Sequence, residues 1–373
     1  MITLPNGQTY QVSSAGGYPP GSAPASRKLF AAAHVVADPL GDNTPGRPAA
    51  VDWDATMAYR HHLWSYGFGI AEAMDTAQRG MGLDWTATQE LIRRTGAAAA
   101  GPFACGAGTD QLSGVDHSVA DILAAYEEQV GVVEAAGGQV ILMASRALAA
   151  SAAGPDDYHR VYGSLLAQTA QPVILHWLGP MFDPALAGYW GSSDLDAATA
   201  VFLEIIKANA SKVDGVKISL LDAGREVALR RSLPTGVRCY TGDDFHYPEL
   251  IQGDSEGYSD ALLGIFDAIA PAASAAVTAL DKGDLDTYNA IFAPTVPLSR
   301  HIFGTPTYYY KTGIVFLAWL AGHQSHFKMV GGLENARTVP HLVELFLLAD
   351  AANLLPDPEL AEHRMRAFLE VSA

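Results

Sequence analysis

The sequence is poor in cysteine, with only Cys105 and Cys239 among 373 residues. Two cysteines cannot form the disulfide framework of a small secreted domain, so we expect the chain in a reducing compartment. The first residues, MITLPNGQTYQV, also lack the charged segment and apolar stretch of a secretory signal. Both absences favour a cytoplasmic location.

Basic residues are also scarce. The chain has 23 Lys and Arg against 40 Asp and Glu, which gives a formal net charge of −17. Such an acidic balance argues against nucleic acid and anionic membrane surfaces as partners. The longest strongly apolar stretch, residues 313–322, is too short to span a bilayer and predicts a core helix. A soluble enzyme with a small-molecule substrate is therefore expected.

Short apolar runs alternate with helical patterns from Arg27 onward. Such alternation predicts parallel strands, and eight strand–helix units predict a closed (β/α)8 barrel, or TIM barrel, of the α/β class. The alternative is an open doubly wound sheet, but no G-x-G-x-x-G follows the first run. The eight runs predicted as strands are 28–37, 67–73, 97–106, 139–145, 172–178, 214–220, 236–243 and 256–262.

The two ends of the chain differ from this middle part. Asn6-Gly7 lies between two short runs and predicts a β-hairpin, and residues 13–26 are rich in Gly, Pro and Ser, as is typical of a connector. Near the C-terminus the strand patterns stop and helical patterns follow. The predicted organisation is a hairpin and linker over 1–26, a barrel over 27–270, and a helical extension packed on the barrel over 271–373.

A single lysine, Lys217, lies in the apolar run VDGVKIS at 213–219. Because side chains alternate along a strand, Val216 and Ile218 are predicted to face the helices, and Lys217 and Ser219 the barrel interior. Desolvation lowers the pKa of a lysine, and the neutral amine can attack a carbonyl to form a Schiff base. The alternative is an inward lysine in a buried ion pair, and the pattern alone favours neither.

The segments around this lysine resemble motifs of the dihydrodipicolinate synthase / N-acetylneuraminate lyase family of class I aldolase-type barrels. GVKIS at 215–219 resembles the family's Schiff-base segment, and PVILHW at 172–177 resembles the segment before it. YTGDDF at 240–245 and GYSDALLGIF at 257–266 resemble the family's seventh and eighth segments. The resemblance covers roughly residues 28–350 in the correct order.

This resemblance carries several implications. It implies a (β/α)8 barrel with a helical C-terminal extension, usually assembled into an oligomer such as a dimer or tetramer. It also implies chemistry that makes or breaks a carbon–carbon bond at a lysine-bound 2-keto acid, with no cofactor.

The first departure from the family pattern is His176, which stands where the family has a proton-relaying tyrosine. Histidine also transfers protons near neutral pH, so we predict Lys217 and His176 as the catalytic residues. The alternative is that His176 is simply hydrogen-bonded in the barrel mouth.

The second departure is the loop after the second strand. The family's G-T-T-G-E loop binds the substrate carboxylate, whereas residues 67–85 of this chain contain Glu72, Asp75, Thr76 and Arg79. Two carboxylates would repel a keto acid but suit hydroxyl groups, so the predicted substrate is a sugar-like or sugar-acid carbonyl compound. Arg79 is predicted to clamp an anion, with a surface position in the loop as the alternative.

Further polar groups at strand ends complete the predicted substrate site. They are His34 after the first strand, Arg146 after the fourth, Ser219 on the sixth and Asp243 after the seventh. A lone histidine in an apolar strand is more often a satisfied core residue, and aspartates such as Asp243 favour turns for local reasons.

Two other functions compete with the Schiff-base lyase or aldolase, which is the favoured prediction. The first is a metal-dependent sugar isomerase or epimerase, and the second is a non-catalytic barrel that binds a metabolite. No tight ligand motif such as H-x-H or H-E-x-x-H supports the first, and no metal is predicted. The candidate ligands for Mg²⁺, Mn²⁺ or Zn²⁺ would be His34, Glu72, Asp75, His176, Asp243 and His246.

Overall fold

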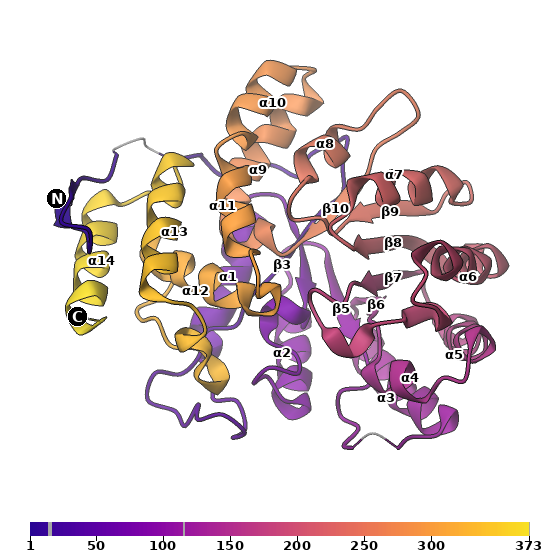
Figure 1. Cartoon of the computed structure of the whole chain (residues 1–373). Helices are drawn as coiled ribbons and strands as arrows, with labels where there is room; N and C mark the ends of the chain where they lie inside the picture. Colours follow the sequence, from indigo (N-terminus) through magenta and orange to yellow (C-terminus); the bar gives the residue numbers. More distant parts are fainter. Residues whose placement is uncertain (14–16, 115, 373) are drawn as a thin grey trace. The chain divides into compact units, whose positions relative to one another are not determined.

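The computed structural model describes residues 1–13, 17–114 and 116–372 (Figure 1). By its internal contacts the chain divides into two compact units. The terminal unit comprises Met1–Gly69, Asp75–Leu83 and Gly264–Ala373, and the central unit comprises Ile70–Met74 and Asp84–Leu263.

Within the described residues, eight parallel strands close into a barrel in the order β10-β3-β4-β5-β6-β7-β8-β9. The predicted TIM barrel is therefore confirmed, and each of the eight predicted runs overlaps one of its strands. The barrel strands are β3 (Leu29–Ala32), β4 (Gly69–Glu72), β5 (Phe103–Ala107), β6 (Gln139–Leu142), β7 (Val173–Leu178), β8 (Val213–Ser219), β9 (Arg238–Thr241) and β10 (Asp260–Leu263).

Helices follow the barrel strands along the chain, and further helices form the C-terminal region. The α-helices are α1 (Trp53–Ser65), α2 (Trp85–Ala98), α3 (Val119–Ala135), α4 (Arg146–Ser151), α5 (Pro155–Gln168), α6 (Leu195–Ala208), α7 (Ala223–Ser232), α8 (Tyr247–Gln252), α9 (Ile265–Asp281), α10 (Leu285–Phe292), α11 (Thr295–Ile302), α12 (Tyr310–Leu320), α13 (Val339–Ala351) and α14 (Pro358–Ser372). Short 3-10 turns are η1 (Asp75–Ala77), η2 (Pro184–Leu186), η3 (Tyr189–Gly191), η4 (Ala210–Lys212), η5 (Thr307–Tyr309) and η6 (Val330–Asn335).

In the central unit, helices such as α5, α6 and α7 lie on the outer side of strands β7 to β9 (Figure 1). The ring of Trp177 in β7 contacts Phe202 of α6 and Trp190 of η3, with ring centroids 5.5 and 6.2 Å apart. Trp177 therefore faces the helices. Because neighbouring side chains on a strand point to opposite faces, His176 faces the barrel interior.

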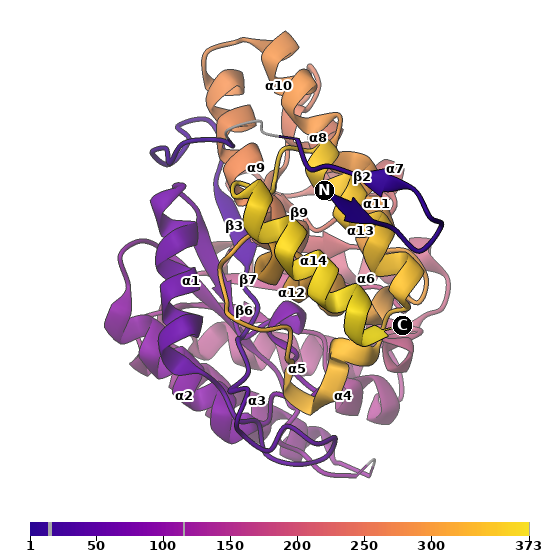
Figure 2. The ribbon, with the colours of Figure 1, turned by 90° about the vertical axis from the view of Figure 1, so that its left-hand side faces the viewer.

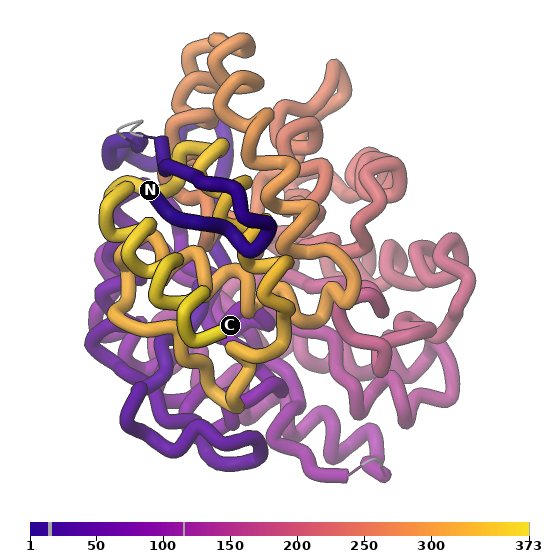
Figure 3. Tube along the Cα trace, turned by 60° about the vertical axis from the view of Figure 1, so that its left-hand side comes forward, coloured from indigo at the N-terminus to yellow at the C-terminus, as the bar shows by residue number. Residues whose placement is uncertain are grey.

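The terminal unit contains the hairpin and the C-terminal helices. Strands β1 (Ile2–Thr3) and β2 (Thr9–Tyr10) pair antiparallel, as Asn6-Gly7 predicts. This hairpin lies beside α14 (Figures 2 and 3), and the backbone N–H of Val12 donates to Glu362 of α14 over 2.9 Å. The two ends of the chain are thus joined.

The C-terminal helices follow the predicted patterns, except that one predicted helical stretch forms two helices. The stretch predicted as helical after residue 271 divides into α9 and α10, and Gly283, with φ of 74°, makes the turn between them. The predicted boundary at residue 270 lies inside α9, and the division into domains stays a prediction.

The most apolar helix of this region is α12. Every one of its residues is buried, as the prediction of a core helix requires. No helix in the described part of the chain is long and apolar enough to cross a bilayer. Of the predicted connector 13–26, residues 14–16 lie outside the described residues, and 17–26 form neither helix nor strand.

The first glycine of GVKIS is required by packing inside the barrel. A Cβ atom on Gly215 would lie 2.6 Å from Cε2 of Tyr240, and Tyr240 pairs with Lys217 across β8 and β9. The aromatic ring therefore fills the space that a side chain at position 215 would need. The glycine leaves room for the residue layer directly below the lysine.

We predict that Gly215→Ala destabilises the protein by roughly 1–3 kcal/mol, because the added methyl group forces Tyr240 or the strand to move. The matched control is Gly131→Ala in α3, where a Cβ would meet nothing within 4 Å. An exposed helical alanine stabilises by up to about 1 kcal/mol relative to glycine. Urea unfolding of both variants measures the difference, and equal effects would contradict this packing.

Candidate active site

Lys217 lies on the interior face of the barrel in the central unit. It pairs with His176 of β7 on one side and Tyr240 of β9 on the other. Residues in register on neighbouring parallel strands share a face, so the three side chains point the same way. Lys217 is 7% exposed. The strand pattern thus places the amine of Lys217 in an interior that is largely shielded from solvent, beside His176.

The neighbourhood of the lysine is shaped by a second glycine. A Cβ atom on Gly242, just after β9, would collide with Oγ of Ser219 and lie 3.0 Å from Cε of Lys217. The N–H of Gly242 donates to the carbonyl of Ile218 over 2.9 Å. The backbone of the 242 turn therefore closes directly over the lysine side chain, which any larger residue would prevent.

His176 is buried and electrically neutral. Burial holds the pKa of His176 well below its ordinary value of 6.5, and the nearby charge of Lys217 lowers it further. Nε2 lies 3.2 Å from Oγ of Ser219. Nδ1 is buried and has no hydrogen-bond partner in the part of the chain that the structure describes. If Nε2–H donates to Ser219, Nδ1 carries a free lone pair that can accept a proton.

A buried glutamate behind the seventh strand is absent from the sequence predictions. Glu226 of α7 accepts a hydrogen bond from Oγ of Ser259 over 2.7 Å. Burial raises the pKa of Glu226 to about 8, although hydrogen bonds from Ser259 and Thr241 lower it, and the charge of Asp243 adds to the rise. An acidic residue in the first turn of a helix is common, so nothing in the sequence marks it as buried.

Asp243 is held in the turn that follows β9. Its carboxylate accepts from the backbone N–H groups of Phe245 and His246 over 2.8 and 3.0 Å, and Oδ2 lies 3.0 Å from Nδ1 of His246. These contacts match the turn-forming alternative. Substrate binding by Asp243 stays a prediction.

Glu72 ends β4 with both carboxylate oxygens engaged. Oε2 accepts from the hydroxyl of Thr95 in α2 over 2.7 Å, and Oε1 accepts from the N–H of Ala73 over 2.9 Å. These bonds tie the strand end to the helix that follows it. Binding of substrate hydroxyls by Glu72 stays a prediction. Glu72 would have to accept such hydrogen bonds in addition to those from Thr95 and Ala73.

Asp75, Thr76 and Arg79, the other predicted site residues of this loop, belong to the terminal unit. Thr76 is buried, and its hydroxyl lies 2.8 Å from the hydroxyl of Tyr310 in α12. Arg79 is 4% exposed, so it is not a surface arginine, and its backbone pairs with Leu83. Asp75 begins η1 and is half-buried.

Arg146 begins α4 and reaches Asp183. Its Nε lies 2.5 Å from Oδ2 of Asp183, and its side chain is 46% exposed. An ion pair with one solvated partner contributes little to stability, so this pair leaves Arg146 able to exchange partners. Its predicted role in substrate binding is untested.

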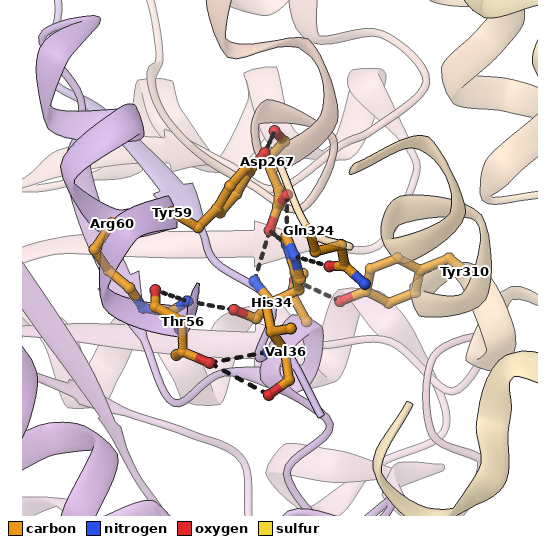
Figure 4. A network of polar contacts seen from close by, with 9 residues as sticks. His34, Val36, Thr56, Tyr59, Arg60, Asp267, Tyr310 and Gln324 are labelled. Atoms are coloured by element: carbon orange, nitrogen blue, oxygen red, sulfur yellow. Dashed lines mark hydrogen bonds and ion pairs between the residues drawn. The ribbon is translucent and has the colours of Figure 1, made fainter. Parts of the chain in front are cut away.

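His34 lies in a polar network of the terminal unit (Figure 4). Nδ1 lies 2.9 Å from both carboxylate oxygens of Asp267 in α9, and Nε2 lies 3.2 Å from Oε1 of Gln324. Arg60 donates to the carbonyl of His34. Both ring nitrogens are therefore occupied, as in the alternative of a satisfied core histidine, and a substrate-binding role for His34 stays a prediction.

The residues proposed for a metal site are not grouped as ligands. Among the described residues, no three His, Cys, Asp or Glu side chains are placed to hold a metal ion together.

A family described as "Protein of unknown function (DUF993)" matches residues 5–373. The chain belongs to the DUF993 family. A search of the curated proteins found no match for the DUF993 chain.

Solved structures similar to this DUF993 protein carry names from the dihydrodipicolinate synthase family. One is a putative dihydrodipicolinate synthetase from Pseudomonas aeruginosa, with 17% identity, a TM-score of 0.67, and coverage of 87% of this chain and 99% of the other. YagE, a prophage protein of E. coli K12 solved in complex with pyruvate, has 13% identity, a TM-score of 0.68, and coverage of 88% and 99%. Dihydrodipicolinate synthase from Oceanobacillus iheyensis has 14% identity, a TM-score of 0.66, and coverage of 88% and 97%.

These likenesses establish a shared fold. The resemblance that the sequence motifs predict is confirmed at the level of the fold. Substrate and mechanism do not follow from identities this low.

The shifted pKa of Glu226 predicts a pH-dependent stability. Unfolded glutamate ionises near pH 4.5, whereas the folded group holds its proton to about pH 8, so stability should fall as the pH rises between these values. The loss is at most about 5 kcal/mol. Glu226→Gln keeps the hydrogen bond with Ser259 and should abolish this part of the fall.

Urea unfolding at pH 5.5 and 8.5 tests the prediction. The matched control is Glu344→Gln, which changes an exposed glutamate. An unaltered pH dependence in Glu226→Gln would show that the group is ionised in the folded state.

Proposed function

We propose that this DUF993 protein is a class I aldolase-type lyase that forms a Schiff base between Lys217 and a carbonyl substrate. The observation that carries the proposal is the placement of Lys217 beside a neutral His176 on the interior face of the barrel. In such barrels the chemistry takes place at the C-terminal ends of the strands, where this part of β7 and β8 lies.

The covalent step needs no external reagent. Neutral Nζ of Lys217 attacks the carbonyl carbon, a C–N bond forms, and the carbonyl oxygen leaves as water with one proton from the amine and one from solvent. The resulting iminium accepts the electron pair of the bond between the α- and β-carbons when that bond breaks, which leaves an enamine, and the reverse step forms the bond. Water from the forward step hydrolyses the iminium at the end and restores the lysine.

His176 is proposed to move protons in this cycle. Its Nδ1 is buried and unpartnered among the described residues, and Ser219 can fix the ring through Nε2. A neutral imidazole can take the proton from a substrate hydroxyl during bond cleavage and return it in the reverse direction. This is the role that the family pattern gives to a tyrosine.

The substrate class is supported less directly. Glu72 and Asp75 predict a sugar-like or sugar-acid carbonyl compound, and the oxygens of Glu72 already accept hydrogen bonds from Thr95 and Ala73. The pyruvate bound in YagE makes simple 2-keto acids the first comparison in any substrate panel.

Borohydride trapping tests the lysine. The hydride reduces the iminium to a stable secondary amine. Incubation with a panel of 2-keto acids, keto-sugars and aldehydes should therefore add the mass of one substrate less one oxygen atom to the peptide containing Lys217. Lys217→Met should abolish the adduct. Lys212→Met is the matched control, since Lys212 donates to the carbonyl of Thr169 and should not matter.

An adduct that persists in Lys217→Met would exclude this lysine as the nucleophile. Activity that chelators abolish, without any adduct, would instead support the metal-dependent isomerase. A ligand bound with equal affinity by Lys217→Met, without adduct or turnover, would support the non-catalytic barrel.

The role of His176 is tested by separating adduct formation from turnover. His176→Phe keeps a ring in the barrel but removes both nitrogens, so kcat should fall by roughly 100-fold or more while the Lys217 adduct is still trapped. Because the pKa of His176 is well below 6.5, the wild-type rate should not fall through pH 6–7 on account of this group. His246→Phe is the control, and an equal loss of kcat in it would remove the argument for His176.

A further inference from the structure

A cavity in the terminal unit is lined by none of the residues proposed for catalysis. It has a volume of about 110 Å³ and is bordered by α1, α9, α12 and the turn after α13. Its aromatic walls include Tyr59 and His62 of α1, Tyr66 directly after α1, and His323 after α12. Leu317 of α12, with alanines and prolines in and near these helices, supplies the apolar wall.

Two histidines in the wall have unused hydrogen-bonding capacity. The rings of His62 and His323 lie 4.1 Å apart between centroids, and both rings contact Tyr59. In the described part of the chain, neither imidazole makes a hydrogen bond to another residue. Each neutral imidazole offers one N–H donor and one lone pair, so two donors and two acceptors face a partly enclosed space.

The tyrosine hydroxyls of the same wall are already bonded. The hydroxyl of Tyr59 donates to the carbonyl of Asp267 over 2.6 Å, and that of Tyr66 donates to the carbonyl of Tyr18 over 2.9 Å. The tyrosines therefore present their rings, and the polar contacts available to a ligand are those of the two histidines.

The charges around the cavity favour neither an anionic nor a cationic ligand. Among the described residues that line it, none is Lys or Arg, and the carboxylate of Asp267 is bonded to His34 (Figure 4). An anion would meet the field of Asp267 without a cation in the wall. Arg364 lies outside this wall and donates to the carbonyl of Trp319.

The lowered pKa values of the two histidines indicate that a positive charge is disfavoured in the cavity. Burial lowers the pKa of His323 to about 3, and the neighbouring His62 lowers it further. Burial also lowers the pKa of His62, although the charge of Asp267 opposes this shift. A site that removes the proton from two imidazoles would also resist an organic cation.

We propose that this cavity binds an uncharged, ring-sized molecule with a hydrogen-bonding edge, such as a neutral heterocycle or a cyclic alcohol. The edge bonds the free nitrogens of His62 and His323, and the body packs on Tyr59 and the apolar wall. A cavity of about 150 Å³ accommodates benzene, so about 110 Å³ with an open side suits a five-membered ring. Ligand sites of this kind combine apolar walls with a few placed polar groups.

Pyrazole is the direct probe, because it is a neutral five-membered ring with one donor and one acceptor. Isothermal titration or protein-observed NMR at pH 8.5 should give a Kd on the order of millimolar, as for other very small ligands. Furan, which has the same size but no donor, should bind about tenfold more weakly. Charge is tested with imidazole at pH 5.5, where it is a cation, and tetrazole at pH 8.5, where it is an anion.

Variants assign the binding to this cavity. His62→Phe and His323→Phe keep aromatic rings, so they should weaken pyrazole binding to the level of furan without changing furan binding. Ala268→Phe fills the cavity from α9 and should abolish both. Ala228→Phe on the exposed face of α7 is the matched control, and thermal unfolding checks that each variant is folded.

The proposal is supported if pyrazole binds at both pH values while imidazolium and tetrazolate bind at least about tenfold more weakly. It is overturned if a charged ring binds as well as pyrazole, if pyrazole does not bind, or if both histidine variants bind it normally. Binding that survives in a folded Ala268→Phe variant would place the ligand elsewhere and would also overturn it.

Discussion

The space around Lys217 is the constraint on which the rest of the candidate site depends. Gly215 makes room for the ring of Tyr240 below the lysine, and Gly242 lets the backbone after β9 close over its side chain. The in-register pairing of β7, β8 and β9 then sets His176 next to it on the same face. A lysine held in this way has few rotamers available, which is the preorganisation that a nucleophile needs.

Desolvation fixes the protonation of several groups in a chain that carries a formal charge of −17. Burial keeps His176 neutral and Glu226 protonated, and it keeps His323 neutral in the other unit. These three buried groups are therefore uncharged near neutral pH. A neutral histidine beside a lysine suits proton transfer during Schiff-base chemistry, because a second positive charge there would oppose formation of the iminium.

Much of the fold could be predicted because it depends on short-range patterns. Three features are local patterns: the eight apolar runs, the Asn6-Gly7 turn, and the alternation that directs Lys217 to the barrel interior. The structure contains the strands and the hairpin that these patterns predict. The surroundings of individual polar groups could not be predicted in the same way. His34 meets Asp267 across 233 residues of sequence, and Glu72 turns to Thr95 at a strand end where Ala73 adopts a φ of 54°. Such contacts depend on the closed fold and on local backbone geometry, which periodicity does not specify.

The central claim is that Lys217 bonds covalently to a carbonyl carbon with His176 beside the reacting atoms. A crystal structure of the protein after borohydride reduction in the presence of a substrate tests both parts at once. We expect a single bond from Nζ of Lys217 to the former carbonyl carbon, with a substrate oxygen within hydrogen-bond distance of His176. A substrate bound without a covalent link, or a link to another lysine, would contradict the account.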